Sequence, residues 1–149
     1  MILISFRDAG ITLSCQLNEL EDSKMGDPLS KVLRVPEGKE RLQVLELGTG
    51  CGMVGITIAQ RVSKADIILT DLPEAEEIVQ KNIDQATLVN DSTLRFQTLD
   101  WDDHVPKDLN NWAKCPHCAE LDLIIAADCT YNPDSRWAPS SSYCLRWHI

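Results

Sequence analysis

The chain has 149 residues, 44% of them hydrophobic and 25% charged, which is typical of one globular domain. Its formal net charge of −9 argues against proteins that bind nucleic-acid backbones or anionic membranes. No apolar run approaches the roughly 18 residues that a membrane-spanning helix needs, and Ile2–Phe6 is too short for a secretory segment. These features predict an intracellular protein, cytoplasmic or nuclear, without a nucleic-acid or membrane partner.

The six cysteines are scattered, which favours free thiols in a reducing compartment. Only Cys115-Pro-His-Cys118 has a spacing typical of metal ligands. No second pair accompanies it to complete a set of four ligands, so we expect no metal site.

The N-terminal segment contains two β-prone runs, Ile2–Phe6 and Ile11–Leu17, separated by the turn residues Arg7–Gly10. This pattern predicts a short β-hairpin. A polar stretch rich in Gly and Pro follows, in which only Pro28–Val35 has room for a helical turn or two.

From residue 42 the apolar pattern alternates between short buried runs and helical spacing. Strands alternating with helices predict an α/β fold with a mostly parallel sheet and right-handed crossovers. The expected strands are Leu42–Leu47, Asp66–Thr70, Leu94–Leu99 and Leu121–Ala127, and the expected helices are Met53–Val62 and Ala75–Leu88.

Three segments are therefore predicted along the chain. Residues 1–41 form the hairpin and a connecting segment, residues 42–135 form the core, and residues 136–149 form an irregular tail without periodicity.

The first strand of the core runs into Gly48-Thr49-Gly50-Cys51-Gly52, a turn whose missing β-carbons let a ligand lie directly on the backbone. Gly50, Gly52 and Gly55 form a literal GxGxxG pattern, and Asp71 follows about 20 residues later, as in NAD-binding units. The glycines alone fit either a dinucleotide or S-adenosylmethionine (SAM).

Acidic residues near this turn favour SAM. Glu46, on the strand before the first glycine, would repel a pyrophosphate, whereas SAM carries a cationic amine and a sulfonium; we expect Glu46 to act through water or backbone groups. Asp71, at the end of the second strand, can accept hydrogen bonds from both ribose hydroxyls, a role that serves either cofactor. Its alternative role is to cap the helix that begins near Pro73.

Asp100-Trp101 closes the third strand at the same edge of the sheet, where Asp100 could bind the adenine amino group. The alternative is a core or surface tryptophan beside a turn aspartate. Leu72 and Asn82 are lesser candidates: Leu72 could line the adenine pocket, whereas Asn82 lies mid-helix, where it could simply cap or be solvated.

Asp128-Cys129-Thr130-Tyr131 directly follows the fourth strand and faces the crevice in which open α/β sheets bind ligands. Methyl transfer to nitrogen requires an aligned neutral amine and stabilisation of the charge that develops on it. Asp128 could orient a lysine ammonium and offset the developing charge, and Tyr131 could form a wall or donate a hydrogen bond. Alternatively, Asp128 caps the next helix and Tyr131 packs.

Taken together, these residues resemble the seven-strand, Rossmann-like class I SAM-dependent methyltransferases, and more narrowly the lysine-methyltransferase-like group called methyltransferase family 16. The matching segments are VLELGTGCGMVGI, ILTDLPEAEEIVQKNI, LDW and DLIIAADCTYNPDS. The resemblance implies catalysis and protein-lysine positioning by Asp128 and Tyr131. It implies a SAM pocket of Glu46, Gly48, Gly50, Asp71, Trp101 and Ala127, to which we add Thr49, Gly52, Leu72 and Asp100.

The chain departs from this family in two ways. Lys24–Lys39 lacks the family's upstream tryptophan, and the family continues with further strands where this chain ends, which predicts an incomplete, truncated sheet. The alternatives are an inactive SAM-binding isoform or scaffold, and a methyltransferase for small nicotinamide-like amines. Glu46 argues against an NAD-dependent oxidoreductase.

Overall fold

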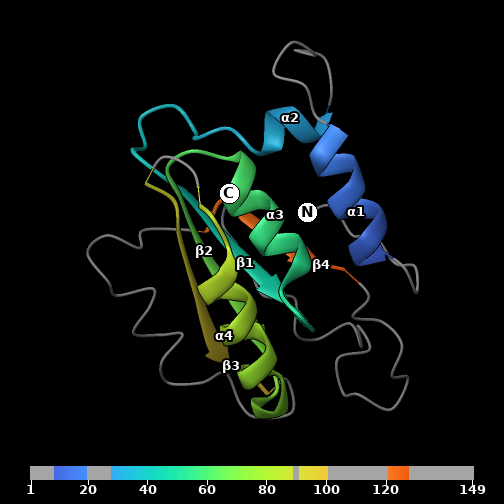
Figure 1. Ribbon diagram of the computed structural model, residues 1–149. Coiled ribbons are helices and arrows are strands. Elements are labelled where there is room, and N and C mark those ends of the chain that lie inside the picture. The colour runs from blue at the N-terminus through green and yellow to red at the C-terminus, as the bar shows by residue number, and fades with distance from the viewer. Residues whose placement is uncertain (1–8, 20–27, 89–90, 101–120, 128–149) are drawn as a thin grey trace, which may run out of the picture.

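The computed structural model describes residues 9–19, 28–88, 91–100 and 121–127. These residues form a four-stranded sheet and its helices (Figure 1). The strands are β1 (Leu42–Leu47), β2 (Ala65–Asp71), β3 (Thr93–Thr98) and β4 (Leu123–Ala126), and the helices are α1 (Ala9–Glu19), α2 (Pro28–Val32), α3 (Met53–Arg61), the 3-10 turn η1 (Pro73–Ala75) and α4 (Glu76–Gln85).

The strands lie in the order β3-β2-β1-β4, and every neighbouring pair is parallel. From β1 the chain adds β2 and then β3 on one side, and it returns to place β4 on the other side of β1. The direction of strand addition therefore reverses between β1 and β4. Open α/β sheets bind ligands at such a switch point, outside the carboxyl ends of the strands.

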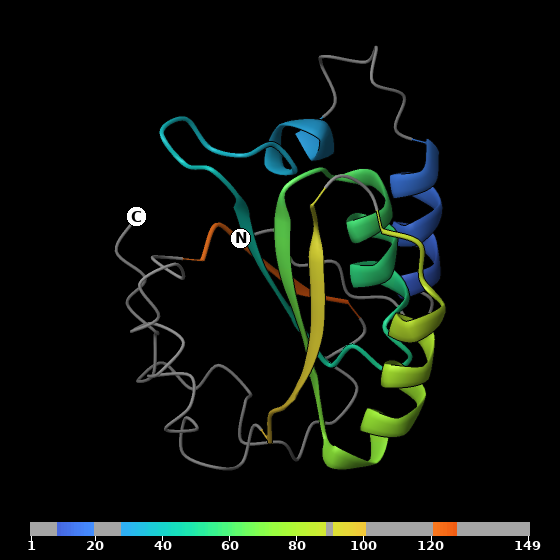
Figure 2. The same ribbon diagram turned by 60° about the vertical axis from the view of Figure 1, so that its left-hand side comes forward.

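The helices α1, α3 and α4 lie on one face of the sheet, as Figure 2 shows. Apolar side chains that alternate along β1 and β2 point into this layer, because successive strand residues face opposite sides. The buried core includes Leu42, Val44, Ile67, Leu69, Val54, Ile58 and Val79.

The structure confirms the α/β fold, the parallel sheet and each core strand and helix expected from the sequence. The second helix is shorter than expected: α4 ends at Gln85 because Ala86 has an extended backbone (φ −74°, ψ 134°). The predicted tail, residues 136–149, lies outside the described residues.

The predicted N-terminal hairpin is wrong in its second half, because Ile11–Leu17 lies within α1. Leu13 and Leu17 are one helical turn apart, and both are buried in the core that α3 contributes to, whereas Ile11 is 55% exposed. Burial of this i, i+4 pair against α3 outweighs the strand preference of the β-branched residues. Ile2–Phe6, the predicted partner strand, lies outside the described residues.

Within the described ranges, no helix has the length and apolar character needed to cross a membrane. Cys15 and Cys51 are exposed free thiols. Cys115 and Cys118 fall in a part of the chain that the structure does not describe.

Candidate functional site

The turn between β1 and α3, residues Gly48–Gly52, lies at the switch point and is called the glycine turn below. Gly50 and Gly52 have φ angles of +60° and +83°, a left-handed conformation that strongly favours glycine. A β-carbon on Gly50 would meet nothing within 4 Å, so one side of the turn is open. A β-carbon on Gly52 would lie 3.1 Å from the side chain of Leu69, so its other side is packed against the core.

Glu46 points inward beneath this turn and is only 2% exposed. One carboxylate oxygen, Oε2, accepts hydrogen bonds from the Thr49 hydroxyl at 2.8 Å and from the Gly55 amide at 2.9 Å. Glu46 therefore joins the turn to the first turn of α3. This arrangement agrees with the expectation that Glu46 acts through backbone groups.

Burial, with a smaller contribution from the negative charge of Asp71, raises the pKa of Glu46 to about 7. The hydrogen bonds from Thr49 and Gly55 oppose this shift because they stabilise the carboxylate. The protonation state of the group beneath the turn thus changes near neutral pH.

Gly55, the third glycine of the GxGxxG pattern, is required by packing. A β-carbon there would lie 2.2 Å from Leu69 Cδ2 and 2.8 Å from Glu46 Oε2. The absence of a side chain lets α3 approach β1 and β2 closely. Such an approach is common to dinucleotide folds and other α/β folds, so it does not by itself separate NAD from SAM.

Asp71 ends β2 and lies beside the glycine turn. Its Oδ2 accepts a hydrogen bond from the Gly50 amide at 2.7 Å, and its Oδ1 accepts one from the Leu72 amide at 2.8 Å. Each oxygen retains further lone-pair capacity for a ligand hydroxyl. The N-cap residue of η1 is Leu72 and not Asp71, and η1 has no side-chain cap hydrogen bond, so the capping alternative for Asp71 is wrong.

Asn82 of α4, a lesser candidate from the sequence, makes a contact that the sequence did not predict. The Asn82 side-chain amide donates a hydrogen bond of 2.8 Å to the carbonyl oxygen of Cys51, within the glycine turn. The only signal in the sequence was that Asn82 is three residues after Val79, on the face of α4 that packs inward.

The structure brings together six of the twelve predicted site residues. Gly48, Thr49, Gly50 and Gly52 form the turn, with Glu46 beneath it and Asp71 beside it. The Thr49 hydroxyl is turned inward toward Glu46, so it does not face the open side of the turn.

The remaining predicted residues lie at the edges of this site or outside the described residues. Leu72 is 46% exposed next to Asp71, and Ala127 is buried directly after β4. Asp100 follows β3. The end of β3 is joined to β2 by a 2.8 Å hydrogen bond from the Leu99 amide to the Asp71 carbonyl oxygen. Trp101, Asp128 and Tyr131 fall outside the described ranges.

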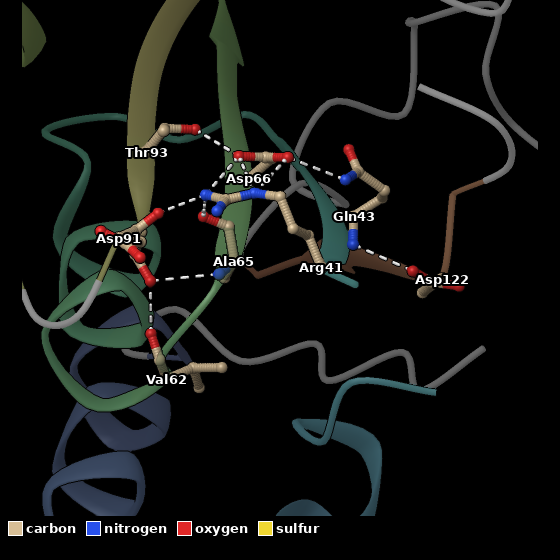
Figure 3. A network of polar contacts seen from close by, with 9 residues as sticks. Arg41, Gln43, Val62, Ala65, Asp66, Asp91, Thr93 and Asp122 are labelled. Atoms are coloured by element: carbon tan, nitrogen blue, oxygen red, sulfur yellow. Dashed lines mark hydrogen bonds and ion pairs between the residues drawn. The ribbon is translucent and has the colours of Figure 1, made fainter. Parts of the chain in front are cut away.

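The opposite end of the sheet carries a different polar network, shown in Figure 3. Asp66 accepts two bonds of 2.9 Å from Arg41 Nε and one of 2.7 Å from the Thr93 hydroxyl. Gln43 joins Asp66 through its side chain and Asp122 through its main-chain amide, each at 2.9 Å. At this end of the sheet, the charged side chains bond mainly to one another and to polar side chains of neighbouring strands.

A family model described as lysine methyltransferase matches residues 5–138 of this chain. A UPF0665 family protein of Schizosaccharomyces pombe is 31% identical over 98 residues, which is 65% of this chain and 27% of that protein. The calmodulin-lysine N-methyltransferase of Arabidopsis thaliana is 28% identical over 98 residues, which is 64% of this chain and 30% of that enzyme.

The protein-lysine N-methyltransferase EFM3 of Saccharomyces cerevisiae is 31% identical over 112 residues, or 70% of this chain. The match covers 30% of EFM3, so this chain spans less than a third of the length of each of these three relatives. The family match takes in β1 to β4, including the glycine turn and Asp71. The chain belongs to the lysine methyltransferase family.

Proposed function

We propose that this chain binds SAM at the glycine turn and forms the cofactor-binding part of a protein-lysine N-methyltransferase. The observation that carries the proposal is the hydrogen bond between Asp71 and the Gly50 amide, which places a carboxylate beside the open side of the glycine turn. This turn lies at the switch point of the sheet, in a chain that matches the methyltransferase family. NAD binding has no comparable support, since the family match is to methyltransferases.

The residues present suit the chemistry of SAM. Asp71 offers two carboxylate oxygens to the ribose hydroxyls, and the missing β-carbon of Gly50 leaves room for the ligand against the backbone. Asp71, together with Glu46 when it is ionised, places negative charge near a ligand that carries a cationic amine and a sulfonium, whereas a pyrophosphate would be repelled. SAM supplies the methyl group, attached to its sulfonium, when bound.

The acceptor side is assigned to Asp128 and Tyr131. They follow β4, which lies parallel to β1, so the chain leaves β4 at the same edge of the sheet as the glycine turn. In this proposal Asp128 orients the lysine nitrogen and offsets the positive charge that develops on it, and Tyr131 walls the lysine channel. A protein with an accessible lysine is the proposed substrate, and the cytoplasm or nucleus the proposed location.

The first test is isothermal titration of the whole chain with S-adenosylhomocysteine, the demethylated product, and separately with NAD. We expect saturable binding of the former only, weakened about tenfold or more by Asp71→Ala because a charge-assisted hydrogen bond pair is lost. Asp84→Ala is the matched control, since Asp84 also accepts a side-chain hydrogen bond but is an exposed residue of α4. A folded chain that binds NAD, or neither ligand, contradicts the proposal.

Transfer is tested separately with SAM carrying a labelled methyl group. Label on lysine in a protein extract supports the protein-lysine assignment, and label only on small nicotinamide-like amines supports the small-molecule alternative. Binding without any transfer supports the inactive SAM-binding or scaffold alternative.

A further inference from the structure

The glycine turn leaves two backbone groups that a regular helix would have joined. If α3 began one residue earlier, the Cys51 carbonyl would accept the bond from the amide four residues on, which is that of Gly55. In the structure α3 begins at Met53, and its first bond runs from the Ile56 amide to the Gly52 carbonyl at 3.0 Å. The Cys51 carbonyl and the Gly55 amide are each satisfied by a side chain instead.

Glu46 accepts a hydrogen bond from the Gly55 amide, and Asn82 donates one to the Cys51 carbonyl. Glu46 Oε2 accepts from Gly55 N at 2.9 Å, and Asn82 Nδ2 donates to Cys51 O at 2.8 Å. The two side chains come from different elements, β1 and α4. Together they bond to the two groups, the Gly55 amide and the Cys51 carbonyl, whose direct hydrogen bond would extend α3 by one residue.

Packing supports the same role for α4. A β-carbon on Gly52 would lie 3.5 Å from Val79 Cγ1, and Val79 is fully buried one helical turn before Asn82. The face of α4 that carries Val79 and Asn82 therefore lies against the glycine turn. Val79 fills the space beneath Gly52, and Asn82 provides the polar contact beside it.

We propose that Asn82 is a positioning residue for the cofactor site: by holding the Cys51 carbonyl, it keeps the glycine turn in its open, left-handed form. This inference rests on the proposed function, because its consequence for binding requires that SAM bind at the turn. The contact couples the position of α4 to the shape of the site.

The test compares Asn82→Ala and Asn82→Asp with Gln80→Ala in the whole chain. Gln80 is the matched control because its amide donates only within α4, to Asp84 at 2.8 Å. Asn82→Asp keeps the size of the side chain but presents a carboxylate to a carbonyl oxygen near neutral pH. Affinity for S-adenosylhomocysteine is measured by titration, and melting temperature is recorded for each variant.

We expect both Asn82 variants to bind S-adenosylhomocysteine about five- to tenfold more weakly, as for loss of one hydrogen bond, and Gln80→Ala to bind like wild type. A role confined to stability would lower the melting temperature and leave the affinity of the folded chain unchanged. Wild-type affinity in Asn82→Asp, or equal effects of Gln80→Ala, overturns the inference.

Hydrogen exchange gives a second readout that does not depend on the ligand. The Gly52 amide, bonded to the Thr49 carbonyl at 2.9 Å, should exchange faster in Asn82→Ala and Asn82→Asp and unchanged in Gln80→Ala. If wild type fails to bind S-adenosylhomocysteine, the proposed function fails, and exchange still decides whether Asn82 holds the turn. Unchanged exchange at Gly52 in both Asn82 variants overturns that role.

Discussion

The two ends of the sheet use similar side chains for different purposes. At the amino end, Arg41, Asp66 and Thr93 bond to one another across strands. At the carboxyl end, Glu46 and Asp71 bond to main-chain amides of the glycine turn and the residues next to it. An acidic group thus joins neighbouring strands in one place and shapes a loop in the other.

This contrast separates stability from binding. Side chains that satisfy one another fix the register of the strands, and little of their capacity is left for a ligand. Side chains that bond to the backbone leave the open side of the turn available for the proposed cofactor. Substitutions at the amino end should therefore lower the free energy of unfolding, while those at the carboxyl end should also alter cofactor affinity.

The largest effect is expected for Gly55→Ala. The new methyl group would lie 2.2 Å from Leu69 Cδ2 and 2.8 Å from Glu46 Oε2, so α3 must move away from the sheet. We expect a loss of about 3 kcal/mol in the free energy of unfolding, measured by urea denaturation. Gly10→Ala is the control, because its β-carbon would meet only Val54 Cγ2 at 3.8 Å; an equal loss in both variants would refute the packing argument.

The next effect concerns Glu46→Gln and its dependence on pH. Because the pKa of Glu46 is raised to about 7 in the folded chain, the folded state binds a proton that the unfolded state releases near pH 4.5. The contribution of Glu46 to the stability of wild type is therefore largest below about pH 4.5, and it is lost as the pH rises through about 7.

Glutamine does not titrate, so the variant lacks this decline. Between about pH 5 and about pH 8 the stability of Glu46→Gln relative to wild type should rise by on the order of 2 kcal/mol. Denaturation curves at several pH values measure this difference. A difference that stays constant with pH would show that Glu46 titrates normally.

A smaller effect is expected at the amino end for Asp66→Asn. Burial opposes ionisation of Asp66, but hydrogen bonds from Arg41, Thr93 and Gln43 outweigh it and lower its pKa. We expect a loss of about 1 to 2 kcal/mol in unfolding free energy at neutral pH, with unchanged affinity for S-adenosylhomocysteine. The wild-type advantage should disappear as the pH falls below about 4, through the lowered pKa.

Asp71→Asn is the matched variant at the carboxyl end. It should show the reverse pattern, with weaker binding and a smaller loss of stability. Equal binding losses in both variants would remove the distinction between the two ends of the sheet.

The smallest effect is expected for Lys39→Gln, which removes the ion pair with Asp122. The side chain of Lys39 is 30% exposed, so solvent screens the pair. We expect a change of about 0.5 kcal/mol in the free energy of unfolding, reduced further by salt. A loss of several kcal/mol would mean that β4 depends on this ion pair for its position.

The sheet could be predicted from the sequence because β1 and β2 are short segments rich in Leu, Ile and Val, each followed by turn residues. The N-terminal helix could not, since the residues of Ile11–Leu17 prefer strands locally and become helical through contacts with α3. Local preference does not reveal a partner that lies far away in the chain.

For the candidate site, the sequence predicts which residues lie at the strand ends but not how their side chains are oriented. The glycines and Asp71 predict a ligand at the strand ends. The sequence Leu45-Glu46-Leu47 does not indicate which way Glu46 points, because β1 is buried on both faces. The contact from Asn82 required knowing how α4 lies against the turn. The roles of Trp101, Asp128 and Tyr131 remain predictions.

The parallel arrangement of the strands has a consequence for how the chain folds. β1 is bonded on one side to β2, soon after it in sequence, and on the other to the segment of β4, with Gln43 and Asp122 in contact although 79 residues separate them. Closing that long loop costs more entropy than forming the β1-α3-β2 unit. The glycine turn can therefore form early in folding, before β4 pairs with the other side of β1.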